Sequence, residues 1–236
     1  MRSTEQSAAL IHGDTIYSPK EKNSGKRIGG GSVNILAIAD EECPSLWDYY
    51  TPGCLDEYDL IISSGDLKPS YLSFLVTMAP CPVMYVHGNH DGRYKEQPPE
   101  GCECIDGKVV TYKGVRILGL GGSIEYTGGP HQYTQKQMNR RIRRLKWAIR
   151  KAGGVDLVVT HAAPRGVGDA EDFAHRGFTG FLKLIERYRP KALLHGHVHL
   201  RYGTNIKREQ EYEGTKVINV CGQYTLKYPG NFSVDH

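Results

Sequence analysis

The chain of 236 residues lacks any long hydrophobic run. No apolar stretch approaches the roughly 18 residues that can cross a bilayer as a helix. Its first residues include Arg2, Glu5 and Lys20 and have no apolar core between a basic start and a cleavage site, unlike a secretory signal. These absences exclude a membrane-spanning protein and predict a cytoplasmic location with no membrane partner.

A strong excess of charge of one sign is also missing. Thirty Lys and Arg against 26 Asp and Glu give a net charge of +4, which indicates no nucleic-acid partner unless the cations gather in one patch. The predicted helix after Thr134 does gather cations. They could attract a polyanion at low salt, but we favour a merely solvated helix face. The cations are Arg140, Arg141, Arg143, Arg144, Lys146, Arg150 and Lys151.

The six cysteines show no zinc-finger spacing. Cys102 and Cys104 have no matching Cys or His pair, and two thiolates cannot complete a tetrahedral zinc site. In a cytoplasmic chain of this length we expect the thiols to be reduced.

The length allows one large α/β domain or two small ones, and we favour one. Residues 1–32 are polar and end in Gly29-Gly30-Gly31-Ser32, which is typical of a flexible linker. We therefore predict a leader over residues 1–32 and a single domain over residues 33–236. There is no internal repeat and no low-complexity block.

Five short runs indicate buried strands, and a polar cluster follows each. Such runs suit a sheet that is covered on both faces, where the loops at the carboxyl ends of the strands converge on one crevice. The runs are Asn34 to Ala39, Leu60 to Ser63, Val83 to His87, Leu157 to Thr160, and Ala192 to His195.

Helices and a hairpin are predicted between these strands. Pro69 suits a first helical turn, and Tyr71, Leu72 and Leu75 recur at helical spacing. Lys108 to Tyr112 and Val115 to Leu120 flank Lys113-Gly114, a two-residue hairpin turn, so we expect a mixed sheet.

Two further helices and the chain end complete the predicted domain. Thr134 and Gln137 form a capping-box signature, and Met138, Ile142, Leu145 and Ile149 make one apolar stripe behind it. A last helix over Gly180 to Tyr188 should turn Phe181, Leu182 and Ile185 inward. Lys216 to Cys221 is predicted as a strand, and Tyr224 to His236 as a loosely structured end.

The polar clusters contain the ligand types that two adjacent divalent ions need for phosphate chemistry. Such ions clamp a phosphoryl group and lower the pKa of water, and the two oxygens of a carboxylate such as Asp66 can face one ion each. The clusters are Asp40-Glu41-Glu42, Gly65-Asp66, Gly88-Asn89-His90-Asp91, His161, and Gly196-His197-Val198-His199. Glycines 65, 88 and 196 allow tight turns and close backbone approach.

With these motifs, Val33 to Val220 resembles the calcineurin-like metallophosphoesterase superfamily, whose motifs run in the same order. The resemblance implies a four-layer αββα sandwich of two mixed sheets and two bound metal ions. It also implies that His90 protonates the leaving oxygen or stabilises the pentavalent phosphorus, and that Asp91 orients His90. The implied ligands are Asp40, Asp66 and His199 for the first ion, and Asp66, Asn89, His161 and His197 for the second.

One position departs from the family pattern: Glu42 stands where a histidine is usual, and we take it as a variant ligand of the first ion. The same Asp-Glu-Glu segment resembles a narrower bacterial subgroup. An oxygen-rich first site favours hard cations, so manganese is the expected metal, with iron, zinc, nickel or cobalt as alternatives.

The sequence therefore predicts a metal-dependent phosphoesterase, and the compact chain with its short loops favours a phosphodiesterase over a phosphomonoesterase or protein phosphatase. A non-catalytic scaffold of the same fold is the other alternative. Asn89, His90 and Arg176 are candidate substrate contacts, and a nucleotide is a candidate substrate. Arg176 could instead pair with Asp169 or Asp172 in the loop after His161.

Overall fold

The structure is a computed structural model that describes residues 32–202 and 206–229, all within one compact unit. The predicted leader lies outside the described residues except for Ser32. Across the described ranges, no helix is both long and apolar enough to cross a membrane.

The first sheet has five strands, and its middle strands end at the predicted polar clusters. β1 to β4 are mutually parallel, whereas β13 pairs antiparallel with β1. In spatial order the strands are β13 (Gly222–Tyr228), β1 (Val33–Ala39), β2 (Leu60–Ser63), β3 (Val83–Tyr85) and β4 (Glu103–Cys104).

The second sheet has six strands and is also mixed. β12, β10, β9 and β6 are parallel, and the outer strands β11 and β5 pair antiparallel with their neighbours. The spatial order is β11 (Glu209–Tyr212), β12 (Thr215–Asn219), β10 (Ala192–His195), β9 (Leu157–Thr160), β6 (Val115–Leu120) and β5 (Val109–Tyr112). A small third sheet pairs β7 (Ser123–Ile124) with β8 (Gln132–Tyr133).

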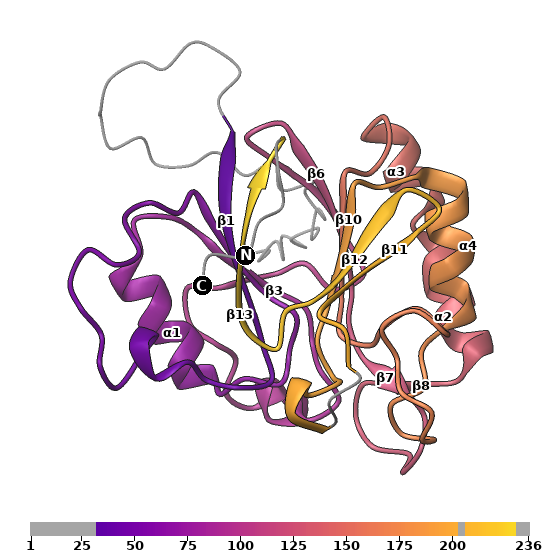
Figure 1. Cartoon of the computed structure of the whole chain (residues 1–236), viewed down its shortest axis with the longest axis horizontal. Coiled ribbons are helices and arrows are strands. Elements are labelled where there is room, and N and C mark those ends of the chain that lie inside the picture. The colour runs from indigo at the N-terminus through magenta and orange to yellow at the C-terminus, as the bar shows by residue number, and fades with distance from the viewer. Residues whose placement is uncertain (1–31, 203–205, 230–236) are drawn as a thin grey trace, which may run out of the picture. The chain divides into compact units, whose positions relative to one another are not determined.

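Helices cover the outer face of each large sheet. α1 (Pro69–Met78) lies on the five-stranded sheet, and α2 (Gln135–Arg144), α3 (Lys146–Lys151) and α4 (Thr179–Tyr188) lie on the six-stranded sheet (Figure 1). Three 3-10 helices, η1 (Pro44–Leu46), η2 (Asp91–Lys95) and η3 (Leu200–Tyr202), complete the described part. The predicted four-layer αββα sandwich of two mixed sheets is confirmed.

The side-chain alternation of β1 shows how the layers are built. Ile35 and Ala37 join the core between the two sheets, whereas Leu36 and Ile38 join the core beneath α1. A third core lies between the six-stranded sheet and α2, α3 and α4. Because both faces of the central strands are covered, their sequences are continuous apolar runs.

Most predicted local structure agrees with the observed elements. The hairpin turns at Lys113 and Gly114, both with positive φ, and the Thr134–Gln137 capping box is present. The helix after Thr134 is interrupted at Leu145, which divides it into α2 and α3. In α4, Leu184 is buried and the predicted Leu182 is only half-buried.

The prediction for the chain end is wrong over its described part. Gly222–Tyr228 forms β13 and pairs with the whole of β1. Tyr224 and Leu226 are buried while Gln223 and Lys227 are exposed, which is the period-2 pattern of an edge strand. With only two buried side chains, the segment has too little apolar character to stand out in the sequence.

Candidate metal centre

The loops that follow the parallel strands meet at one edge of the sandwich. Asp40 follows β1, Asp66 follows β2, and His161 follows β9. The main-chain N–H of His197 donates to both oxygens of Asp40 at 2.9 and 3.0 Å, which links the loops of the two sheets. Residues far apart in the chain are therefore fixed against one another here.

Asp66 lies at the middle of this cluster. Its Oδ2 is 3.2 Å from Nε2 of His161, which is fully buried, and its Oδ1 accepts the main-chain N–H of His90 at 2.8 Å. The same Nε2 of His161 is 2.9 Å from Oδ1 of Asn89. One carboxylate, one amide oxygen and one imidazole nitrogen therefore face a common point.

His197 joins this group. Asp66, His161 and His197 each offer a ligand atom, and these atoms lie within 4.8 Å of one another. Carboxylate and imidazole donors together suit a divalent ion of borderline hardness. The donors present therefore fit the metal that the sequence motifs imply.

Hydrogen bonds fix the orientation of the three predicted histidine ligands. Nδ1 of His161 lies 2.9 Å from the carbonyl of Ser64, and Nε2 of His197 lies 2.9 Å from the carbonyl of Ala174. Because a carbonyl can only accept, these nitrogens carry hydrogen, and the other ring nitrogen is the one that can face a metal. Burial alone would lower the pKa of His161, but the charge of Asp66 beside Nε2 outweighs it and raises that pKa to about 9, so a metal bound there would displace a proton.

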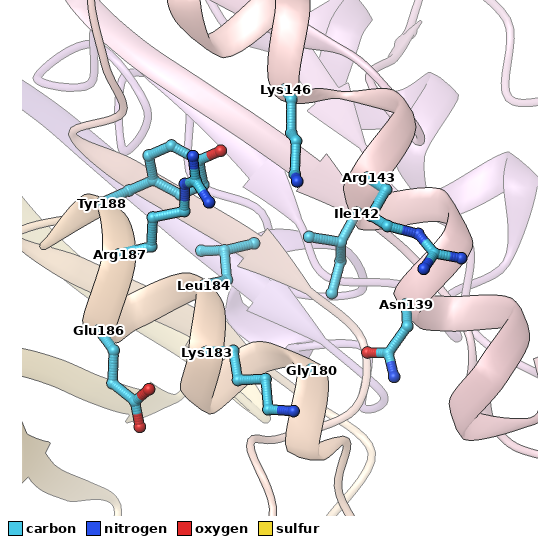
Figure 2. A pocket seen from close by; sticks show the side chains of 10 residues that line it. All are labelled: Asn139, Ile142, Arg143, Lys146, Gly180, Lys183, Leu184, Glu186, Arg187 and Tyr188. Atoms are coloured by element: carbon cyan, nitrogen blue, oxygen red, sulfur yellow. The ribbon is translucent and has the colours of Figure 1, made fainter.

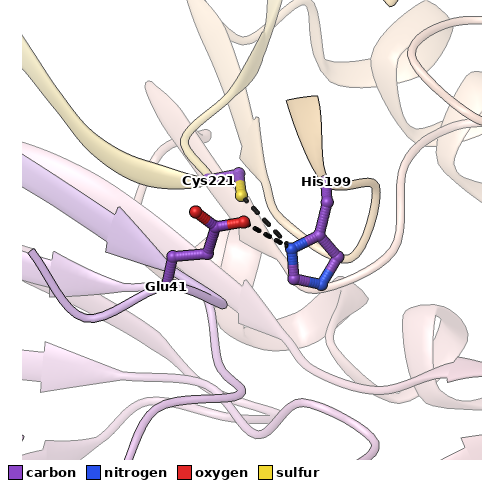
Figure 3. Close-up of side chains that lie close together, drawn as sticks. All are labelled: Glu41, His199 and Cys221. Carbon is purple, nitrogen blue, oxygen red and sulfur yellow. Dashed lines mark hydrogen bonds and ion pairs between the residues drawn. The ribbon is translucent and has the colours of Figure 1, made fainter. Parts of the chain in front are cut away.

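His199 is oriented in the same way, but by a side chain instead of a main-chain carbonyl. Its Nδ1 lies 2.8 Å from Oε1 of Glu41 and 3.9 Å from Sγ of Cys221, as Figure 3 shows. The bond from His199 lowers the pKa of Glu41, and burial raises the pKa of Cys221 to about 12. Cys221 is therefore a neutral thiol beside the imidazole, and Glu41 is the group that orients His199.

Glu42 pairs with a lysine. Its carboxylate is 3.0 Å from Nζ of Lys68, although it lines the same cavity as Asp40 and Asp66. The ligand role predicted for Glu42 stays a prediction. Sequence reasoning placed Glu41 in the first cluster but gave it no role, because its contact with His199 spans 158 positions of the chain.

The backbone at three predicted ligands is left-handed. Asp40, Asp66 and His197 have φ values of 61°, 58° and 68°. Such conformations are unfavourable for residues other than glycine and concentrate at functional sites, where surrounding structure holds them.

Close packing explains the neighbouring glycines. A Cβ on Gly88 would lie 2.0 Å from Oδ1 of Asp66, and a Cβ on Gly196 would lie 2.3 Å from Oδ2 of Asp40. A Cβ on Gly65 would lie 2.3 Å from the nitrogen of Gly88. The predicted close backbone approach at these three glycines is confirmed.

Electrostatics at the centre favour an added cation. Desolvation raises the pKa of Asp40 to about 7, a rise that His161 opposes and Asp66 reinforces. Burial alone would raise the pKa of Asp66, but the charge and hydrogen bond of His161 outweigh it and lower that pKa. Burial, reinforced by His161, lowers the pKa of His197 to about 3, so this imidazole is neutral, as a metal ligand must be.

Asp91 has different partners from those predicted. Its Oδ2 accepts the main-chain N–H groups of Gly88 at 2.7 Å and Asp66 at 2.9 Å, whereas the exposed ring of His90 is 4.0 Å from Asp66. The physical reason is that Asp91 is buried beneath the loop while His90 projects from it. Asp91 thus holds the two loops together, and its predicted role in orienting His90 stays a prediction.

The loop after His161 contacts one side of the centre through His197. Ala174 contacts His197, and the ring of His175 lies 4.8 Å from that of His197. Arg176 turns elsewhere: its Nε donates to the carbonyl of Glu171, and its guanidinium lies over Phe173. Among the described contacts Arg176 pairs with neither Asp169 nor Asp172, and the substrate contact predicted for it stays a prediction.

Sequence reasoning also missed Tyr126. The amide Nδ2 of Asn89 donates to its hydroxyl at 3.1 Å, which directs Oδ1 of Asn89 toward His161. Tyr126 lies in a short loop between β7 and β8 with no motif around it, so no signal in the sequence marks it.

A third group of potential ligands is a structural bridge. His87, Asp106 and His131 lie together, but Asp106 also accepts from Arg141 of α2 and from the N–H of Gly121. A guanidinium on this carboxylate repels a cation and compensates the charge. The bridge joins the loop before Gly88 to α2.

Comparisons with known proteins agree with this geometry. The family model for calcineurin-like phosphoesterase matches residues 39–201. A solved crystal structure aligns over 86% of this chain and 100% of its own, with 14% identity and a TM-score of 0.63. The crystal structure of TT1561 of Thermus thermophilus aligns over 85% of this chain and 99% of its own, with 15% identity and a TM-score of 0.53.

These two structures share the fold of this chain. No curated protein sequence gives a significant match. The family match spans the motifs from Asp40 to His199, whose side chains meet at one edge of the sandwich. The chain belongs to the calcineurin-like phosphoesterase family.

Proposed function

We propose that this metal-dependent phosphoesterase is a phosphodiesterase that works with two divalent ions. Asp40, Glu42, Asp66 and His199 would hold the first ion, and Asp66, Asn89, His161 and His197 the second. The observation that carries the proposal is that His161, His197 and His199 each have one ring nitrogen on a carbonyl or carboxylate oxygen outside the predicted ligand set, which directs the other ring nitrogen toward a metal.

Two divalent ions bound there would polarise the phosphoryl oxygens and lower the pKa of a water nucleophile. His90 is suited to the leaving-group side. Its main-chain N–H is held by Asp66 while 74% of its side chain is exposed, so the ring can meet a substrate oxygen without rearrangement of the loop. In this role His90 donates a proton to the leaving oxygen.

The cavity at the centre supports a diester substrate. It has a volume of about 490 Å³, is open, and has the cations Lys68, Arg93 and Arg201 at its rim. A diester carries a second substituent that needs space beside the reacting phosphorus, and a polar or anionic substituent, as in a nucleotide, would meet these cations. Asn89 and His90 remain candidate substrate contacts, whereas the observed contacts of Arg176 do not support one.

The test compares hydrolysis of an aryl phosphodiester and the matching aryl monoester by metal-stripped protein with manganese added back. We expect faster diester turnover that is lost in Asp66→Asn. Faster monoester turnover would replace the diesterase proposal with a phosphomonoesterase. No turnover of either ester by protein that has bound two manganese ions would favour the non-catalytic scaffold.

Parallel titrations with iron, zinc, nickel and cobalt test the choice of manganese. Metal content after dialysis gives the number of ions bound, independently of turnover. A stoichiometry of one ion would contradict the proposed pair of sites.

A further inference from the structure

A second charged surface lies on the outer helix layer. A groove of about 490 Å³ runs between α2 and α3 on one side and α4 on the other. Ile142 and Leu184 face each other across it, and the side chains of Lys146 and Lys183 extend into it (Figure 2). We call this surface, with the adjoining Trp147, the basic groove.

Two rows of cations flank the groove. Arg143 and Lys146 come from α2 and α3, and Lys183 and Arg187 come from α4. Among the ion pairs of the described residues, none involves any of these four side chains. The lining carboxylate, Glu186, accepts a hydrogen bond from the hydroxyl of Tyr212 at 2.7 Å. Four cations against one carboxylate therefore line the groove, and this excess of positive charge favours an anionic occupant.

An exposed tryptophan adjoins the groove. Trp147 is 81% exposed, and it lines a neighbouring hollow that shares Lys146, Arg187 and Tyr188 with the groove. Arg150 lies beside it in the same hollow. The exposed indole lies between cations and offers a flat face, and every nucleobase offers a flat face that can stack on it.

We propose that the basic groove binds a single-stranded nucleic acid, with the four cations on successive phosphates and Trp147 stacked on a base. Cations three or four residues apart on a helix stand about 5–6 Å apart, which suits the repeat of an extended strand. Unpaired bases are required because a duplex hides the base faces that Trp147 would meet. This proposal does not depend on the catalytic proposal for the metal centre.

The patch supports the alternative that the sequence analysis did not favour, a polyanion on this helix face. A net charge of +4 indicates no nucleic-acid partner unless cations gather locally, and the groove gathers them from segments about 40 positions apart. A lipid surface is the weaker candidate, because Trp147 is the one large apolar side chain of α2, α3 and α4 that is exposed.

The first experiment measures binding of a labelled oligonucleotide of roughly 12 nucleotides by fluorescence anisotropy over a range of salt concentrations without divalent ions. Single-stranded DNA and RNA of one sequence are compared with the DNA duplex. Four phosphate contacts predict a slope of log affinity against log salt of about −3, and Lys183→Ala/Arg187→Ala should reduce its magnitude by about 1.4.

The matched control is Lys136→Ala/Arg140→Ala, which removes two exposed cations of α2 that do not line the groove. We expect this pair to bind nearly as the parent protein does. Equal weakening by both pairs would overturn the groove as the site, and thermal unfolding of each variant checks that it is folded.

The second experiment tests the stacking contact. Trp147→Ala should weaken binding about tenfold, whereas Trp147→Phe should keep most of the affinity, and the emission of Trp147 should be quenched on binding. Tighter binding of polyglutamate or of phosphatidylserine vesicles, lost in Lys183→Ala/Arg187→Ala, would replace the nucleic acid by an acidic peptide or a membrane. Equal affinity for the duplex would overturn the stacking contact.

Discussion

In the metal centre, the side chains of Asn89, His161 and His197 are buried, and the backbone of Asp40, Asp66 and His197 is left-handed. Hydrogen bonds join these side chains to one another and to the main chain. In the basic groove, by contrast, the cations are exposed and form no ion pair with any described residue. The first region holds each donor in one orientation, which suits a small ion with strict ligand geometry. The second leaves long side chains mobile, which suits a flexible polyanion. The two regions therefore differ in whether hydrogen bonds fix their charged side chains, and not in how many charges they contain.

Of the substitutions considered, Asp66→Asn should have the largest effect on the metal centre. We expect turnover to fall on the order of a thousandfold or more, because the shared carboxylate is lost, and we expect the metal content to fall with it. Oligonucleotide binding to the basic groove should be unchanged. Retained metal and turnover would show that Asp66 is not the shared ligand.

The tight packing of the centre is tested by Gly88→Ala. The new Cβ would collide with the carboxylate of Asp66, so we expect the free energy of unfolding to fall by roughly 1–3 kcal/mol and turnover to fall as Asp66 moves. Urea unfolding and kinetics measure the two effects. The control is Gly129→Ala, where the nearest atom is the flexible end of Gln132, 3.0 Å away.

Substitutions of Glu41 and Glu42 distinguish a carboxylate that orients a metal ligand from a carboxylate that binds the metal itself. Glu41→Ala should weaken metal binding by about 10–100-fold, because His199 loses the acceptor that fixes its ring. Glu41→Gln retains an acceptor and should lose less. If titration calorimetry shows a greater loss for Glu42→Ala than for Glu41→Ala, Glu42 is a direct ligand of the first ion.

A smaller effect is expected at Asp106, in the bridge that joins the loop before Gly88 to α2. Burial alone would raise the pKa of Asp106, but its hydrogen bond from His87 and the charge of Arg141 outweigh burial and lower that pKa. A lowered carboxyl pKa contributes stability above the pKa of the unfolded chain, and this stability is lost as the pH falls through the folded value. Asp106→Asn should therefore cost roughly 1–3 kcal/mol at neutral pH and much less in acid, measured by urea unfolding.

The least effect is expected for Arg176→Ala. Its guanidinium lies over Phe173 and its Nε bonds to a carbonyl of its own loop, so turnover and KM should change by less than about twofold. A large rise in KM with unchanged metal content would instead place Arg176 on the substrate. Steady-state kinetics on the aryl diester decide between these outcomes.

The strands and motifs of the centre were predictable because their signals are local. A buried strand followed by Gly-Asp or Gly-Asn-His-Asp is contained in about ten residues, and four of the five predicted strand runs end where the observed strands end. Contacts between distant segments were not predictable in this way. Glu41 and His199, Asn89 and Tyr126, and the two rows of the basic groove meet only in the folded chain.

The errors have the same origin. β13 forms because it pairs with β1, and its own composition does not mark it as a strand. Leu184, and not Leu182, lies in the core because that face of α4 packs on the six-stranded sheet. The sequence also does not indicate that the buried carboxylate of Asp91 accepts two main-chain N–H groups. Side-chain partners of this kind depend on burial, which a single sequence does not give.

The left-handed backbone at Asp40 and Asp66 also determines how the centre can be disabled without damage to the fold. Asparagine accepts positive φ more readily than any other residue except glycine, and it keeps the size of aspartate. Alanine or a β-branched residue would add conformational strain to the loss of the ligand. Asp40→Asn/Asp66→Asn is therefore the variant that should remove the metal and the turnover with the least added strain, which makes it the reference for a folded, inactive protein.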